Sequence, residues 1–122
     1  MQLGRFEMCL NVKDLKKSLA FYKKLGFRVV GGKIPKGWAI LHKGDAVIDL
    51  FQGHIPGNVL NFRGGHASKL AAMMRRKGLA LSDVAIPGKG RVGSFIARDP
   101  DGNVLFFDTA PGETTKRRPK GG

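Results

Sequence analysis

Glu7–Phe27 reads EMCLNVKDLKKSLAFYKKLGF, and Val59–Leu79, which starts 52 positions later, repeats its design as VLNFRGGHASKLAAMMRRKGL. Each stretch begins with the alternation typical of a strand, continues with apolar residues at helical spacing, and stops at a glycine, Gly26 or Gly78. Self-similarity of this length indicates one supersecondary unit present twice. The sequence therefore predicts two similar modules.

The two copies differ at the start of their predicted helices. In the first copy, Phe6–Val12 alternates as a strand, and Asp14 is suited to cap the helix that follows. In the second copy His66 stands at the place of Asp14, so we expect a weaker cap there. The predicted apolar stripes are Leu15, Leu19, Tyr22 and Leu25 in the first helix, and Ala67, Leu70, Ala71 and Met74 in the second.

After each predicted helix the chain changes to short apolar runs separated by turns that contain Gly or Pro. The predicted strands are Phe27–Ile34, Trp38–His42 and Ala46–Gln52 in the first copy, and Leu79–Ile86, Arg91–Ala97 and Val104–Asp108 in the second. Each copy is thus βαβββ, and the predicted fold class is α+β, with two βαβββ modules in one domain. The domain covers residues 1–110, with module one at about 3–53 and module two at about 56–110. Residues 111–122, PGETTKRRPKGG, are interpreted as a basic flexible tail.

Charge is the unusual feature of the composition. Lys+Arg 22 against Asp+Glu 9 gives the 122 residues a formal net charge of +13, which favours anionic over cationic partners. The basic runs contain no recognised nucleic-acid motif and no interleaved aromatic residues, so we expect only weak, salt-sensitive association with nucleic acid. Hydrophobic residues at 42% are ordinary for a globular domain.

The compartment is inferred from the cysteine count and from the absence of targeting signals. Cys9 is the single cysteine, so no internal disulfide and no multi-thiolate metal site can form. No apolar run approaches the length of a membrane-spanning helix, and no leader precedes the first strand. We therefore expect a cytoplasmic protein that begins at Met1 and has no membrane partner.

Three local motifs resemble a known superfamily. VKDL at Val12–Leu15, SLAFY at Ser18–Tyr22 with LGF at Leu25–Phe27, and DPDGN at Asp99–Asn103 accompany the two βαβββ copies. Together they resemble the vicinal oxygen chelate superfamily of glyoxalase I, bleomycin-resistance proteins and dioxygenases, over roughly residues 3–110. The resemblance implies modules whose sheets curve around a shared cleft, and a homodimer. It is specific for the fold and much less so for the chemistry.

The resemblance also implies where a metal would bind. Metal-dependent members place one ligand, usually His or Glu, on the first and last strand of each module. Here these positions are Glu7 and Asp49 in module one, and Val59 and Phe106 in module two. Val and Phe have no lone pair, and a catalytic divalent ion generally needs at least three protein ligands. We therefore expect no metal or other cofactor. If a metal does bind, Glu7 and Asp49 are its candidate ligands. Whether the protein is an enzyme stays open. Histidines that could add a ligand are His42, His54 and His66.

Strand alternation predicts which side chains line the cleft. The candidate ligand-binding residues are Glu7, Cys9, Asn11, Asp49, Phe51, Asn61, Arg63 and Phe106. A few polar groups among apolar walls are typical of small-molecule pockets, and no catalytic residue is assigned. In the alternative interpretation Glu7 and Asp49 pair with Arg63 or Arg91, and Cys9 is a packed residue. Phe107 then packs under the helices, while Phe51 and Phe106 fill the cleft.

These observations favour a small-molecule-binding protein of glyoxalase/bleomycin-resistance type without a catalytic metal. An anionic ligand agrees with the charge of the chain, whereas a cationic ligand is repelled at long range. Two alternatives stay open. One is a metal-dependent lyase, isomerase or dioxygenase that uses Glu7 and Asp49, and the other is a polyanion- or nucleic-acid-binding module.

Overall fold

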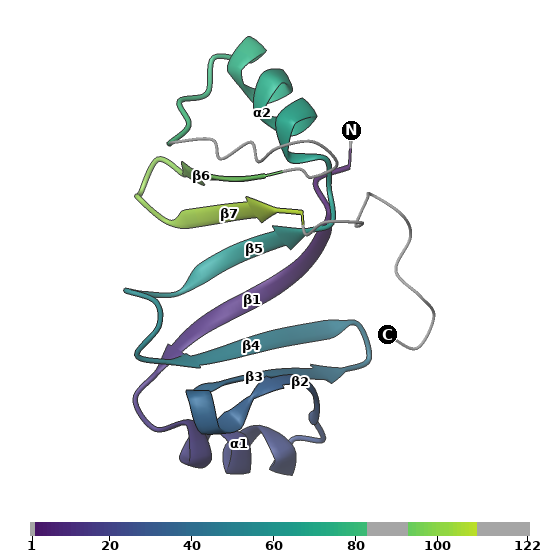
Figure 1. Cartoon of the computed structure of the whole chain (residues 1–122), viewed down its shortest axis with the longest axis vertical. Coiled ribbons are helices and arrows are strands. Elements are labelled where there is room, and N and C mark those ends of the chain that lie inside the picture. Colours follow the sequence, from purple (N-terminus) through teal and green to yellow (C-terminus); the bar gives the residue numbers. More distant parts are fainter. Residues whose placement is uncertain (1, 83–92, 110–122) are drawn as a thin grey trace. The chain divides into compact units, whose positions relative to one another are not determined.

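The computed structural model describes residues 2–82 and 93–109 (Figure 1). These residues form two compact units. The N-terminal unit holds residues 7–58, and the C-terminal unit holds residues 59–82 and 93–109 together with residues 2–6. Each unit combines strands with one α-helix, which confirms the predicted α+β class.

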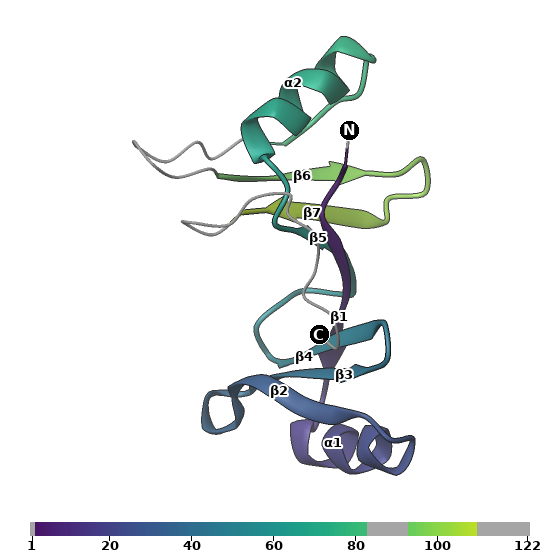
Figure 2. The same cartoon turned by 90° about the vertical axis from the view of Figure 1, so that its right-hand side faces the viewer.

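The N-terminal unit has the predicted βαβββ order. Its elements are β1 (Arg5–Val12), α1 (Leu15–Lys24), β2 (Arg28–Lys33), the 3-10 helix η1 (Ile34–Lys36), β3 (Trp38–Lys43) and β4 (Ala46–Gln52). The strands lie in the order β2-β3-β4-β1, with β1 parallel to β4 and the other neighbours antiparallel. In both views α1 lies beside β2 and β3 (Figures 1 and 2).

Helix α1 begins and ends where its local chemistry requires. The Asp14 side chain accepts a hydrogen bond from the Lys17 backbone N at 3.1 Å, which confirms the predicted cap. Gly26 takes a positive φ of 101° just after the last turn, a conformation that favours glycine. The prediction that Leu25 belongs to the buried stripe is wrong. Leu25 follows the last helical residue, Lys24, and is 53% exposed.

The core of the N-terminal unit lies between α1 and one face of its sheet. Its buried members are Leu15, Leu19, Ala39, Leu41 and Leu50, with Leu10, Val12, Tyr22, Phe27 and Ile48 packed against them. Because strand residues alternate between faces, the residues between these core positions lie on the face turned away from α1.

The C-terminal unit repeats part of this plan. Its elements are β5 (Val59–Arg63), α2 (Ala67–Arg76), β6 (Ser94–Arg98) and β7 (Val104–Asp108). The strands lie in the order β5-β7-β6, with β5 parallel to β7 and β6 antiparallel to it. His66 precedes α2 and makes no side-chain cap hydrogen bond, as the sequence predicted.

The predicted strand Leu79–Ile86 is only partly visible. Residues 79–82 form no strand: Leu81 makes an isolated bridge with Ala97, and the Ser82 backbone N donates to the Ile96 O at 2.9 Å. The chain therefore lies alongside β6 at Leu81 and Ser82. Residues 83–86 and 91–92 of the predicted strands, and the predicted tail 111–122, lie outside the described residues.

The core of the C-terminal unit is aromatic. Phe107 stacks on Phe95 and on Phe62, with ring centroids 4.8 Å and 5.2 Å apart. All four predicted stripe residues of α2 are buried, which confirms that stripe and the packing of Phe107 under the helix. The buried cluster contains Ala67, Leu70, Ala71, Met74, Phe95 and Phe107.

Candidate functional site

The face of the N-terminal sheet turned away from α1 carries acidic, thiol, imidazole and aromatic side chains that could contact a ligand. On β3, Ala39 and Leu41 are buried in the core, so Trp38, Ile40 and His42 lie on the other face. Strand register extends this set across β4 and β1. We define the helix-free face by the residues Glu7, Cys9, Asn11, Trp38, Ile40, His42, Val47, Asp49 and Phe51.

A carboxylate and a thiol meet at the centre of the helix-free face. Cys9 and Asp49 are partners in the β1–β4 register, and the Cys9 thiol donates to Asp49 Oδ2 at 3.7 Å. Asp49 is 4% exposed, Cys9 7% and Glu7 8%. A thiol that donates to a carboxylate is protonated, so Cys9 offers polar lining rather than a nucleophile. The carboxylates offer strong acceptors for a hydroxyl or amine group.

Aromatic rings form a wall at one end of the helix-free face. Trp38 stacks on Phe51 with centroids 6.0 Å apart and an interplanar angle of 8°. His54 meets Phe51 edge-on at 6.3 Å, and His54 Nε2 lies 2.6 Å from the Lys36 carbonyl O. His54 is thus fixed against the wall by its neighbours.

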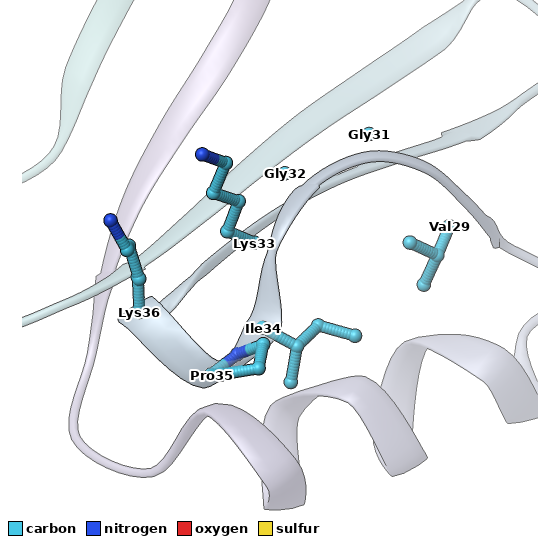
Figure 3. Close-up of a pocket in the computed structure, with 7 residues that line it drawn as sticks. All are labelled: Val29, Gly31, Gly32, Lys33, Ile34, Pro35 and Lys36. Atoms are coloured by element: carbon cyan, nitrogen blue, oxygen red, sulfur yellow. The ribbon is translucent and has the colours of Figure 1, made fainter.

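A cation adjoins this aromatic wall. Lys33 is the register partner of Trp38 across β2 and β3 and is exposed. Figure 3 shows the Lys33 and Lys36 side chains on the side of β2 and η1 that faces away from α1. Lys33 was not among the residues predicted from the sequence, and the face that Trp38 occupies could not be predicted. The register pairs Trp38 with Phe51, which was predicted to line the cleft, so Trp38 lies on the same face as Phe51. The pairing of Lys33 with Trp38 then places Lys33 in the same row.

His42 adds an imidazole to the helix-free face. Its Nδ1 is buried and has no hydrogen-bond partner among the described residues. Val47 is its register partner on β4, and Arg28 on β2. A buried polar nitrogen without a partner is uncommon, and a ligand group can satisfy it.

In the C-terminal unit the corresponding face is held together by its own polar contacts. Asn61 is 6% exposed, and its Nδ2 donates to the Phe106 O at 3.0 Å and to Asp108 Oδ1 at 2.8 Å. Arg63 pairs with Asp108 at 3.8 Å. The two amide hydrogens of Asn61 are therefore committed within the unit. Arg63 and Arg91 were the predicted alternative partners of Glu7 and Asp49. Arg63 forms this ion pair with Asp108, and Arg91 lies outside the described residues.

The donor set does not fit a tightly held divalent ion. Glu7 and Asp49 are the only oxygen donors at the four positions implied by the resemblance, because Val59 and Phe106 are hydrocarbon. Within residues 2–82 and 93–109, no group of three or more His, Cys, Asp or Glu side chains could hold a metal. The expectation that the protein works without a metal stays a prediction.

The fold and the residues on its sheets define an α+β protein built from a repeated strand-and-helix module. Residues 2–81 match the model of the Glyoxalase/Bleomycin resistance protein/Dioxygenase superfamily, and the chain belongs to this superfamily. No curated protein matches the sequence.

Solved structures agree on the fold. An NAD-dependent benzaldehyde dehydrogenase from Legionella pneumophila superposes with a TM-score of 0.69 at 18% identity, covering 86% of this chain and 98% of that one. A glyoxalase/bleomycin resistance protein/dioxygenase superfamily member from Vibrio splendidus 12B01 gives 0.64 at 18% identity, covering 86% and 97%. An extradiol ring-cleaving dioxygenase from B. fuscum gives 0.57 at 21% identity, covering 90% of this chain and 32% of that one. These identities support a shared fold and no particular reaction. No helix in the described part of the chain has the length and apolar character to cross a membrane.

Proposed function

We propose that the protein binds a small organic molecule on the helix-free face of its N-terminal unit, without a resident metal. The ligand has a planar apolar part, an acidic group and a hydrogen-bond donor. The observation that supports this proposal most strongly is the stacked pair Trp38–Phe51, which has Lys33 beside it in the same row.

The three parts of the ligand follow from two groups of the helix-free face and from Lys33, which lies beside it on β2. A planar apolar body gains contact area and stacking on the Trp38–Phe51 wall. An acidic group is attracted to Lys33, which belongs to a chain of net charge +13. A hydroxyl or amine donates to Asp49, which lies two positions from Phe51 on β4.

Trp38 is the single tryptophan of the chain, so its fluorescence reports on this face directly. The test is a titration with 2-naphthoate, followed by Trp38 emission and by calorimetry. 2-Methylnaphthalene and cyclohexanecarboxylate serve as probes that lack the charge or the planar ring. We expect saturable binding of 2-naphthoate that is tighter than binding of either control.

Variants locate the binding. Phe51→Leu is expected to weaken 2-naphthoate binding by roughly three- to tenfold, the loss of one aromatic stack. Phe21→Leu removes an aromatic side chain on α1 that is 59% exposed, and should change nothing. Equal affinity of Phe51→Leu and the unmodified protein would contradict the proposed site.

The metal-free part of the proposal has its own test. Protein purified without chelators is analysed for zinc, nickel, iron and manganese, and we expect less than stoichiometric amounts of each. A stoichiometric metal would instead favour the alternative of a metal-dependent enzyme that uses Glu7 and Asp49. The homodimer expected from the superfamily is tested separately, by sedimentation of the full chain.

A further inference from the structure

A long surface segment of the N-terminal unit carries charge of one sign. Between Asp14 and Asp45 the sequence contains no acidic residue, and every basic residue of this stretch is exposed. These residues are Lys16, Lys17, Lys23, Lys24, Arg28, Lys33, Lys36 and Lys43. Such a surface attracts anionic partners and repels cationic ones.

The same segment exposes apolar side chains. Among the described residues, the large hydrophobic side chains that are exposed outside this segment are Phe6 and Leu79. Those within it are Phe21, Leu25, Val29, Val30 and Ile34. Exposed apolar side chains gathered in one region of a monomer are typical of interaction sites.

A groove connects part of these apolar residues. It has a volume of about 460 Å³. Its lining is Val29, Gly31, Gly32, Lys33, Ile34, Pro35 and Lys36, which we call the β2 groove. Val29 pairs in register with the core residue Leu41, so it lies on the α1 side of the sheet. Figure 3 shows the Val29 and Ile34 side chains on this side, above the ribbon of α1.

One glycine of the groove, Gly32, is needed for the path of the β2 backbone beside β3. Gly32 has a φ of +100°, and a Cβ there would lie 2.5 Å from the Ala39 Cα. No side chain can therefore stand at this position without displacing backbone. The apolar side chains of the lining are those of Val29, Ile34 and Pro35, and its basic ones are Lys33 and Lys36.

The edge of the sheet is not suited to strand addition. Strand β2 is the outermost strand of the N-terminal sheet, with a register irregularity between Val29 and Gly31 and basic residues at both ends, Arg28 and Lys33. Irregular pairing and charged side chains are features by which proteins prevent pairing at an edge. A partner therefore uses side chains in the groove.

We infer that the β2 groove docks an acidic segment of another protein, which inserts a bulky apolar side chain against Val29, Ile34 and Pro35. Charge complementarity selects this occupant, because every charged residue between Asp14 and Asp45 is basic. A second copy would bring the same positive charges to the groove, and the chain's own residues 111–122 are basic as well. A concave groove of this size receives a protruding side chain better than it receives a flat lipid surface.

The test uses labelled acidic peptides of about 12 residues, one with Leu and Phe at its centre and a matched one with Ser at both places. Fluorescence anisotropy with the full chain at physiological salt should show the apolar peptide binding about tenfold more tightly than the Ser peptide. The double variant Val29→Ser with Ile34→Ser should lose this preference. Leu79→Ser removes an apolar side chain of similar exposure elsewhere and should keep it.

Several results would overturn the inference. Equal affinity for the two peptides would show attraction of charge alone, and retention of the preference in the double variant would place binding elsewhere. Vesicles containing about one third phosphatidylserine that bind the unmodified chain but not the double variant would assign the groove to a membrane surface. Loss of self-association in the double variant would assign it to a second copy. Thermal unfolding of each variant verifies that the fold is retained.

Discussion

The two units place different chemistry at the same register positions. In the N-terminal unit the neighbours on the first and last strands are Cys9 and Asp49, and in the C-terminal unit they are Asn61 and Phe106. The first pair joins a thiol to a buried carboxylate, whereas in the second pair an amide donates to the phenylalanine's backbone carbonyl. The repeated topology therefore fixes where the side chains stand and leaves their chemistry free to differ.

The difference extends to what each face can offer a ligand. Asn61 and Arg63 both contact the Asp108 carboxylate within the C-terminal unit, the first through a hydrogen bond and the second through an ion pair. The N-terminal unit instead combines an aromatic wall, an exposed lysine and a histidine nitrogen that has no partner among the described residues. We therefore assign recognition to the N-terminal unit and a more structural role to the polar network of the other.

The largest expected effect on the free energy of unfolding comes from substitutions in the two cores. Phe107 and Leu50 are equivalent core residues of β7 and β4, with 1% and 0% exposure. Phe107→Ala removes a ring stacked on both Phe95 and Phe62, and should lower the free energy of unfolding by about 3–5 kcal/mol. Leu50→Ala should lower it by less, about 2–4 kcal/mol, because an aliphatic side chain makes no stacking contacts.

Urea denaturation of both variants measures these values. Phe107→Leu is the milder variant, to be used if Phe107→Ala does not fold. A larger loss for Leu50→Ala than for Phe107→Ala would contradict the view that the aromatic stack is the stronger core.

The elements that depend on residues close together in the sequence could be predicted. The apolar run Ala46–Gln52 and the Asp14 cap depend on near neighbours, and β4 and the cap were correctly predicted. Leu25 was misplaced because the helical period continues past the residue where the backbone leaves the helix. The face occupied by Trp38 depends on register with β4, which no local pattern reveals.

The helix caps give the next smaller effect. Asp14 accepts a hydrogen bond from the Lys17 backbone N, while His66 makes no such bond at α2. Asp14→Ala should therefore lower the free energy of unfolding by about 1 kcal/mol, and His66→Ala by much less. His66→Asp should raise it by a few tenths of a kcal/mol or more, since it supplies the missing acceptor. Thermal and urea unfolding measure all three, and equal losses for Asp14→Ala and His66→Ala would show that the caps do not distinguish the units.

The smallest expected effect concerns the turn between β6 and β7. Asp99 accepts hydrogen bonds from the Asn103 side chain and from the backbone N of Asn103 and Asp101. These bonds favour the charged carboxylate, so they lower the pKa of Asp99 below its ordinary value of 3.8, the Asn103 side chain contributing most. Because the folded pKa is the lower one, the stabilisation is present above the unfolded pKa and is lost as the pH falls through the folded pKa.

An NMR titration of the Asp99 carboxyl carbon measures this directly. We expect a midpoint below 3.8 in the unmodified chain, and a shift upward towards 3.8 in Asn103→Ala, which removes the side-chain donor. Asp99→Asn should flatten the pH dependence of unfolding below about pH 4 and leave it unchanged at neutral pH. Both this turn and the corresponding turn of the N-terminal unit contain a glycine at a positive φ, Gly102 at 86° and Gly44 at 56°, and the Asp99–Asn103 bonds are added in the first. An unchanged Asp99 midpoint in Asn103→Ala would show that the side-chain bond does not set the charge of this turn, and would leave its backbone donors as the cause.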